Sequence, residues 1–229
     1  MNRQGNIYTF MYAAIMVIVV AAVLSFVSLS LKDKQKRNVE VEKKQNILAS
    51  VNIPANAENA EKIYAELISE TYVVNKAGDK VEGIDAFNVD LNKENAKSAE
   101  KRNLPVFVYT KDGDSKLILP VRGKGLWGPV WGYVALNSDK NTIFGAIFDH
   151  KGETPGLGAE IAGANFQKPF AGKKIFDENG TFVSIKVNKA GVGTDIHSVD
   201  AISGGTITSK GVEAMLQDCL SNYQAFLKK

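Results

Sequence analysis

The segment Asp200–Ser209 (DAISGGTITS) gathers hydroxyl side chains around a pair of glycines, just before a C-terminal helical pattern. Glycine allows a tight turn and the close approach of another group. The free N–H groups of a helix's first turn, together with the positive end of its dipole, favour a phosphate. Thr206 would hold its hydroxyl beside such a phosphate. The cluster can also be simply a helix cap, a role that Thr208 or Ser209 could fill.

A glycine-rich loop, Gly123–Gly128 (GKGLWG), lies between two strand-like segments. It can be a turn that carries a core tryptophan. It can also be a loop whose backbone approaches a flat aromatic ligand, with Leu126 or Trp127 against the ring. The sequence leaves both interpretations open at this point.

A second loop runs from His150 to Glu160 (HKGETPGLGAE) and contains a Thr-Pro-Gly-Leu-Gly turn that leads into a helix. Thr154 could cap that helix. The carboxylate of Glu153 could accept hydrogen bonds from backbone N–H groups or from the imide or hydroxyls of a ligand. This loop is equally compatible with a structural turn and with a binding site.

The residue patterns that acyl transfer, nucleotide hydrolysis or a metal centre would need are missing from the sequence. Ser203 is not in the Gly-x-Ser-x-Gly pattern of a nucleophile elbow. The Gly123–Gly125 segment lacks the spacing and the Lys-Ser/Thr pair of a P-loop. Cys219 is the only cysteine and there are two histidines, so we expect neither an intrachain disulfide nor a metal centre.

The N-terminal part of the chain is expected to be a membrane anchor, and the strands and helices that would position these loops come after it. Residues 7–31 are free of charge and long enough to cross a bilayer, and Lys32–Arg37 follow directly. A cleaved signal peptide usually has a shorter apolar core and a small-residue cleavage site, so we expect a retained transmembrane helix. Residues 1–6 would form a short tail and residues 32–54 a charged juxtamembrane stalk.

The charge is unevenly distributed along the chain. The sequence has 28 Lys/Arg and 25 Asp/Glu, of which residues 1–44 hold seven and three, so the rest carries a net charge of −1. The basic excess is therefore juxtamembrane, where it can meet anionic lipid head groups. No basic stripe with interleaved aromatic residues is present, and we expect no nucleic-acid partner.

Residues 55–229 should form an α+β domain with an antiparallel sheet and flanking helices. Short turns rather than helices join most of the strand-like segments. We expect an amphipathic helix over 57–68 and a C-terminal helix from Ser209. The expected strands are 104–110, 116–121, 130–136, 142–148 and 181–187.

Together the three segments resemble FMN-binding domains. Residues 200–206 are similar to their flavinylation motif, Asp-x-x-Ser/Thr-Gly-Ala-Thr, in which the phosphate of FMN is joined to the last threonine. The resemblance makes Thr206 the modified residue, puts Asp200 and Ser203 at recognition positions, and aligns Gly204 with the motif's glycine. Gly205 stands where alanine is usual; we expect a residue this small to be tolerated, with a looser turn.

The two loops add to this resemblance, and with one N-terminal membrane helix and a similar length it covers nearly the whole chain. Residues 150–158 are similar to the second signature of these domains, which lines the flavin. Residues 123–128 look like the version in C subunits of sodium-translocating NADH:quinone oxidoreductases. The non-covalent flavin contacts expected from these loops are Leu126, Trp127, Glu153, Thr154, Gly156 and Leu157.

The resemblance implies a membrane-anchored electron-transfer subunit with one covalent FMN per chain, in a sodium pump driven by NADH oxidation and quinone reduction. Its partners would be the other subunits of the complex, a flavin transferase and the lipid bilayer. The chain itself would bind neither NADH nor quinone. Lys210, in the first turn of the helix, would add positive charge near the phosphate. Two alternatives are the G subunit of an Rnf-type complex and a non-redox membrane-anchored scaffold of the same fold.

The side of the membrane is a point of conflict. Positive charge after the apolar helix would by itself place the large domain in the cytoplasm. The resemblance implies the periplasmic or external side of the inner membrane, where the flavin transferase acts on exported domains. Because the charge rule is weak for long domains, we expect the external side.

Overall fold

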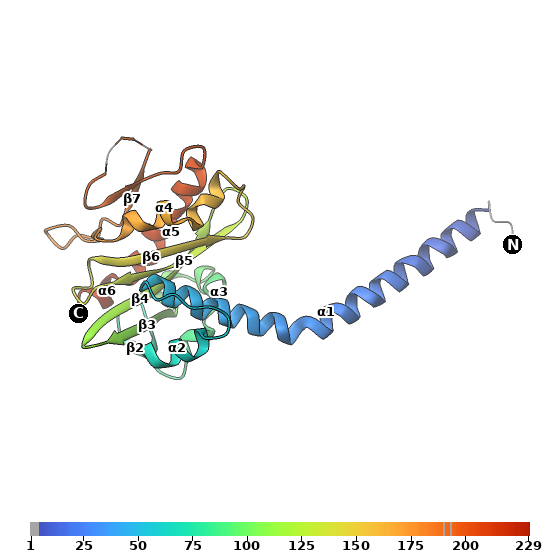
Figure 1. The fold of residues 1–229 in the computed structure, drawn as a ribbon, viewed down its shortest axis with the longest axis horizontal. Coiled ribbons are helices and arrows are strands. Elements are labelled where there is room, and N and C mark those ends of the chain that lie inside the picture. The colour runs from blue at the N-terminus through green and yellow to red at the C-terminus, as the bar shows by residue number, and fades with distance from the viewer. Residues whose placement is uncertain (1–4, 190, 193) are drawn as a thin grey trace. The chain divides into compact units, whose positions relative to one another are not determined.

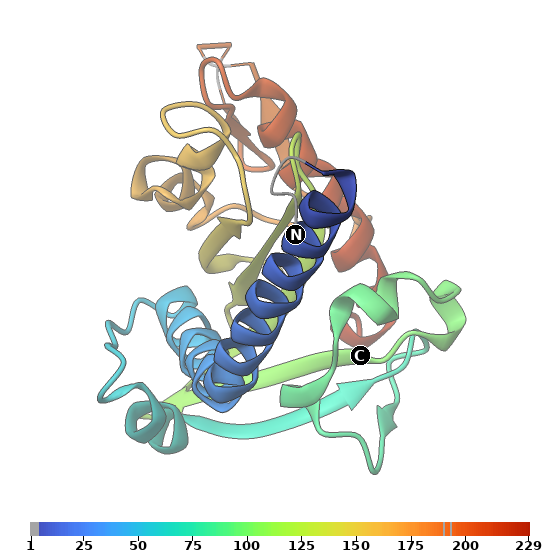
Figure 2. The same ribbon diagram turned by 90° about the vertical axis from the view of Figure 1, so that its right-hand side faces the viewer.

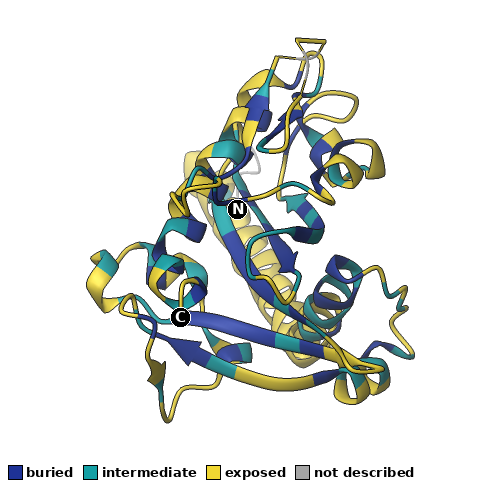
Figure 3. Cartoon of the chain, turned by 90° about the vertical axis from the view of Figure 1, so that its left-hand side faces the viewer, coloured by how far each residue is buried: buried dark blue, intermediate teal, exposed yellow. Residues whose placement is uncertain are grey.

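The computed structural model describes residues 5–189, 191–192 and 194–229. The chain divides into two compact units, Met1–Lys43 and Lys44–Lys229. Helix α1 (Asn6–Ser50) is the one helix in the described ranges that is long and apolar enough to cross a membrane, with a mean hydropathy of 2.7 in its most apolar stretch. The apolar residues of its first part, from Ile7 to Leu31, are exposed (Figure 3), as a lipid-facing surface requires.

The second unit is built on a six-stranded antiparallel sheet in the order β2-β1-β3-β4-β5-β6 (Figure 1). The strands are β1 (Ile68–Val74), β2 (Lys80–Val81), β3 (Leu104–Lys111), β4 (Asp114–Lys124), β5 (Pro129–Leu136) and β6 (Ile143–His150). Tight connections join β3 to β4, β4 to β5 and β5 to β6, as the sequence predicts. The glycine-rich loop is the β4–β5 connection, so the sheet itself fixes both of its ends.

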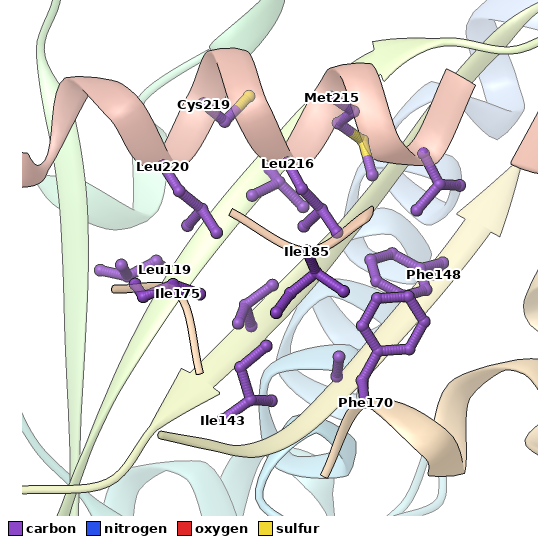
Figure 4. Close-up of a cluster of buried hydrophobic side chains, with 14 of the residues drawn as sticks. Leu119, Ile143, Phe148, Phe170, Ile175, Ile185, Met215, Leu216, Cys219 and Leu220 are labelled. Carbon is purple, nitrogen blue, oxygen red and sulfur yellow. The ribbon is translucent and has the colours of Figure 1, made fainter. Parts of the chain in front are cut away.

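One face of the sheet is covered by α5 (Thr206–Asn222), which packs mainly on β4. Val134 and Leu136 of β5 belong to the hydrophobic cluster on this face. Leu216 and Leu220 point from α5 into the same cluster (Figure 4). The apolar positions of α5 recur at three- and four-residue steps, which explains why one side of this helix is buried.

The other face of the sheet carries a second, smaller cluster. Tyr133 and Ala135, which alternate with Val134 and Leu136 along β5, belong to it, as the two-residue period of a strand requires. The last turns of α1 and the turn after them cover this face. Ile47 in α1 is fully buried, Val51 just beyond the helix is nearly so, and both lie in the cluster. The compact unit therefore begins at Lys44, within the stretch expected to be stalk, because these apolar residues complete the core.

Short elements connect and flank the sheet. The remaining α-helices are α2 (Ala60–Leu67), α3 (Leu91–Asn95), α4 (Ala164–Gln167) and α6 (Gln224–Leu227), and the 3-10 helices are η1 (Ala86–Asn88), η2 (Ala99–Lys101), η3 (Gly158–Ala162) and η4 (Lys168–Phe170). A parallel pair, β7 (Lys186–Asn188) and β8 (Ser198–Asp200), lies outside the main sheet. The C-terminus lies beside the β1–β2 turn (Figure 2), where Lys229 forms an ion pair with Asp79.

Three expectations about elements differ from the structure. The stretch 181–187 is strand only from Lys186, because Ser184 adopts φ of +58°, which breaks an extended chain. The expected helix over 57–68 ends at Leu67, and Ile68 begins β1, a strand the sequence analysis missed. Helix α5 begins at Thr206 rather than Ser209.

Candidate functional site

The three segments singled out in the sequence meet at one pocket of about 410 Å³. The β4–β5 loop, the turn before η3 and the start of α5 form its walls. This volume lies within the range of roughly 300–1,000 Å³ that is usual for small-molecule and cofactor sites. The lining residues are Leu126, Trp127, Glu153, Thr154, Leu157, Gly158, Gly204, Gly205, Thr206, Ile207 and Thr208.

The start of α5 leaves backbone donors at the edge of this pocket. Gly205 is the N-cap residue, and no side chain caps the helix in the described part of the chain. Because the first N–H groups of a helix have no intrahelical partner, those of Thr206 and Ile207 can bind an anion. The expected capping role of Thr208 or Ser209 is therefore wrong.

The hydroxyls of the Ser203–Ser209 segment have different surroundings. Thr208 is buried and donates its hydroxyl hydrogen bond to Oε2 of Glu153, at 2.5 Å. Ser209 is also buried; its Oγ donates to the Gly205 carbonyl and accepts from the Ile202 N–H. Thr206 is exposed and lines the pocket. Among the hydroxyl-bearing residues of this segment that line the pocket, Thr206 is thus the exposed one.

Glu153 is a buried carboxylate between the three segments. Its Oε1 accepts the Trp127 N–H at 2.9 Å, and its Oε2 accepts the Thr208 hydroxyl. Burial alone would raise the pKa of Glu153, but hydrogen bonds from Thr208 and from the N–H groups of Trp127 and Gly128 outweigh it, so the pKa lies below its ordinary value. The carboxylate is therefore ionised at neutral pH and accepts these bonds as an anion.

Two glycines allow the segments to approach this carboxylate. A Cβ atom on Gly125 would lie 2.6 Å from Glu153 Oε1. A Cβ atom on Gly158 would lie 2.6 Å from Glu153 Oε2 and would also collide with Thr208 Oγ1. Glycine is needed at both positions because any side chain would push the loops apart.

Apolar side chains surround the pocket in exposed positions. Trp127 is 71% exposed and Ile207 62% exposed, and Leu126 and Leu157 are also on the surface. Trp127 is thus not the core residue that one interpretation of its loop predicted. Large apolar side chains gathered at one exposed place commonly mark a binding site. With the free N–H groups of α5, they fit a flat ring system that is joined to a phosphate.

Several predicted site residues lie away from this pocket. Asp200 is at the end of β8 and lines a separate cavity of about 640 Å³, together with Glu160 and Ile202. Ser203 and Gly156 are exposed and are not part of the pocket wall. The tight turn of the chain through Gly204, with φ of +76°, separates Asp200 from Thr206.

Two expected roles are also corrected. Lys210, expected to add positive charge near the phosphate, does not line the pocket and forms an ion pair with Glu213 at 2.8 Å. Thr154 does not cap η3, whose N-cap residue is Leu157; its carbonyl instead accepts the N–H groups of Leu157 and Ala159.

Three pocket residues were missed by the sequence analysis: Gly158, Ile207 and Thr208. Gly158 is the last glycine of the Thr-Pro-Gly-Leu-Gly turn, so the motif contained a signal for it. Ile207 directly follows Thr206, and an apolar residue at the exposed start of a helix was a weaker signal. The contact between Thr208 and Glu153 joins residues far apart in sequence, and no local pattern announces it.

Known proteins resemble this chain in sequence and in fold. The profile of the FMN-binding domain family matches residues 125–221. The C subunit of the Na(+)-translocating NADH-quinone reductase of Vibrio vulnificus (strain YJ016) is 34% identical over 214 residues, covering 86% of this chain and 83% of the relative. The corresponding C subunit from Neisseria meningitidis serogroup A is 45% identical over 119 residues, covering 51% of this chain and 45% of the relative.

Two crystal structures share the fold. The C subunit of the Na(+)-translocating NADH-quinone reductase from Parabacteroides distasonis has a TM-score of 0.81 and is 50% identical, covering 87% of this chain and 98% of that chain. Shewanella oneidensis NqrC has a TM-score of 0.72 and is 28% identical, covering 85% of this chain and 97% of that chain. The pocket of the present structure lies within the segment that matches the FMN-binding domain. From its sequence, its fold and this site, the chain belongs to the family of C subunits of Na(+)-translocating NADH-quinone reductases.

Proposed function

We propose that this chain is the membrane-anchored electron-transfer subunit of a Na(+)-translocating NADH-quinone reductase, and that it carries one FMN through a phosphoester to Thr206. The family membership supports the complex. The match to the FMN-binding domain supports the cofactor. The covalent link rests on the geometry around Thr206.

The observation that carries this link is that Thr206 is exposed at the start of α5, on the wall of the pocket. In the phosphoester, Oγ1 of Thr206 would replace one oxygen substituent on the phosphorus of the flavin phosphate that the transferase supplies. The P–O bond to that substituent would break, and the departing group would take the hydroxyl proton of Thr206. The neighbouring N–H groups of the first turn can then stabilise the remaining phosphate charge. Thr208 and Ser209 are buried and already hydrogen-bonded, so neither offers the same reaction.

The other pocket residues would bind and orient the ring. Leu126, Trp127, Leu157 and Ile207 offer apolar surface at the rim, and the glycines keep the walls close together. The bound FMN supplies electron-transfer chemistry, and the protein contributes position and electrostatics. Glu153 holds a fixed negative charge in the wall. We assign the recognition of the unmodified protein by the flavin transferase to the surface around Asp200 and Ser203.

The remaining partners follow from the anchor and the family. The length and apolar composition of helix α1 support its insertion into the bilayer. Residues 32–54 would lead from the membrane to the FMN-binding domain of residues 55–229. In this structure the compact unit that contains this domain begins earlier, at Lys44. Other subunits would bind NADH and quinone and exchange electrons with the flavin. We place the globular domain on the external side of the inner membrane.

The link is tested by mass spectrometry of the full chain, produced with a flavin transferase and exported. We expect an added mass equal to FMN less one water, which Thr206→Ala abolishes. Thr181→Ala, which removes another exposed threonine, should keep the adduct. An unmodified wild-type chain, or an adduct that survives Thr206→Ala, contradicts the proposal. Sodium-stimulated quinone reduction by the purified complex tests the assignment to this pump.

A further inference from the structure

We propose that Glu153 is a positioning residue that selects Thr206, rather than Thr208, as the site of flavin attachment. It does so by holding the Thr208 hydroxyl and the Trp127 backbone in the pocket wall. This inference rests on the proposed function, since it concerns the choice between two threonines of the same helix turn.

Both carboxylate oxygens of Glu153 accept hydrogen bonds from groups of the protein itself. Oε1 accepts the Trp127 N–H at 2.9 Å and Oε2 accepts the Thr208 hydroxyl. The side chain is only 5% exposed. Its own N–H also donates to Nδ1 of His150, at 3.2 Å, which ties its backbone to the end of β6. The carboxylate is therefore a bridge between the three segments.

This bridge acts together with the buried Ser209 and the apolar face of α5 to set the rotation of the first turn of the helix. Residues two apart on an α-helix point in directions about 200° apart. When Thr208 points inward to Glu153, Thr206 must point away from the core. In agreement with this, Thr208 is only 1% exposed, whereas Thr206 is classed as exposed. Without the carboxylate, the inward direction of Thr208 would no longer be enforced, because its hydroxyl would be buried without this partner.

The charge of Glu153 adds a second source of selectivity. A phosphoester on Thr208 would bring phosphate oxygens next to the carboxylate in a buried place, where like charges repel strongly. A phosphoester on Thr206 faces the N–H groups of the helix start instead. Gly125 and Gly158 pack directly against the two carboxylate oxygens, so the carboxylate has little room to turn away.

The test compares substitutions in the full chain, produced with the flavin transferase and exported. Glu153→Ala removes the bridge, Glu153→Gln keeps its shape without the charge, and Thr208→Val removes the hydroxyl donor. Glu94→Gln is the matched control, because Glu94 is also a buried carboxylate that accepts hydrogen bonds but lies outside the pocket. The rate of adduct formation is measured by intact mass. Fragmentation of the tryptic peptide that ends at Lys210 distinguishes Thr206 from Thr208.

We expect the wild type and Glu94→Gln to be modified at similar rates and only on Thr206. Glu153→Ala should be modified on the order of tenfold more slowly, with part of the adduct on Thr208, and Glu153→Gln should lie between it and the wild type. Thr208→Val should also slow the reaction, and combining it with Glu153→Gln should add little, because both changes break the same bond.

The inference would be overturned if Glu153→Ala formed the adduct at the wild-type rate and only on Thr206. It would also be overturned if Glu94→Gln slowed adduct formation as much as Glu153→Ala does. If Glu153→Ala does not fold, Thr208→Val decides, and an unchanged rate in that variant would also overturn it. An unmodified wild-type chain would instead contradict the proposed function.

Discussion

Gly158 lies against both partners of the central hydrogen bond of the pocket. A Cβ atom there would collide with Thr208 Oγ1 and lie 2.6 Å from Glu153 Oε2. We expect Gly158→Ala to destabilise the chain by about 1–3 kcal/mol, the usual range for overpacking, and to reduce flavin attachment. Gly152→Ala is the control, because no atom lies within 4 Å of a Cβ at Gly152. Denaturant unfolding and intact mass measure the two effects, and similar losses in both variants would contradict this explanation.

The lowered pKa of Glu153 predicts how its contribution to stability depends on pH. Because the pKa in the folded chain lies below the ordinary 4.5, the stabilisation is complete above about pH 4.5 and is lost as the pH falls through the folded pKa. At pH 7 we expect Glu153→Gln to lower the free energy of unfolding by about 1–3 kcal/mol. The difference from the wild type should shrink as the pH falls below the ordinary 4.5 and through the lower pKa of the folded chain. Urea titrations of both proteins at neutral and acidic pH measure it, and a difference that grows in acid would refute the prediction.

The sequence predicted most of the individual residues on the pocket wall, because Gly-Lys-Gly-Leu-Trp-Gly and Thr-Pro-Gly-Leu-Gly are local patterns. It could not predict which groups bond to each other. Glu153 was expected to accept hydrogen bonds from backbone N–H groups or from a ligand; it does accept the backbone N–H of Trp127, but its bond to the Thr208 hydroxyl was not foreseen. Such a contact depends on how the β4–β5 loop, the turn before η3 and α5 are folded together, which no short window of sequence contains.

Among the elements, the end of α1 changes the limits of the folded domain. Ile47 and Val51 belong to the cluster that covers one face of the sheet, together with Phe107 and Ile118. We expect a chain that starts at residue 55 to lose its cooperative unfolding transition or to melt well below a chain that starts at residue 44. Each large buried side chain removed costs about 2–5 kcal/mol. Thermal unfolding followed by circular dichroism compares the two chains.

A single substitution serves as the control for this truncation. Ile47→Ala in the chain that starts at residue 44 should give an intermediate loss of stability, because it empties one position of the same cluster. If the chain starting at residue 55 were as stable as the longer chain, the last turns of α1 would not be part of the core.

The strands with a regular two-residue period were predictable, since both faces of the sheet are buried and short turns connect them. The elements that were missed lack such a signal. Ser184 bends the chain at φ of +58°, which a serine rarely adopts and the sequence does not show. The boundary of the domain was missed for a related reason: the charged residues around Ile47 conceal an apolar face that becomes evident only when the sheet is present.

At the scale of the whole molecule, the charge pattern and the proposed route of FMN attachment favour opposite sides of the membrane. The basic residues between Lys32 and Arg37 favour a cytoplasmic location for the domain that comes after the apolar stretch of α1. A domain of this length is exported largely regardless of such charges. Attachment of FMN outside the cytoplasm then requires the external location that we propose.

An introduced cysteine can report this location. Glu178 lies in an exposed turn, and Cys219, the only native cysteine, is 8% exposed. With one membrane-spanning helix, the two ends of the chain must lie on opposite sides. We therefore expect a membrane-impermeant maleimide to label Glu178→Cys in intact spheroplasts, and to label Asn2→Cys only after permeabilisation. The wild type, with its buried thiol, gives the background. The reverse pattern would place the flavin domain in the cytoplasm, where it would not meet an exported transferase, and would contradict the proposed route of FMN attachment.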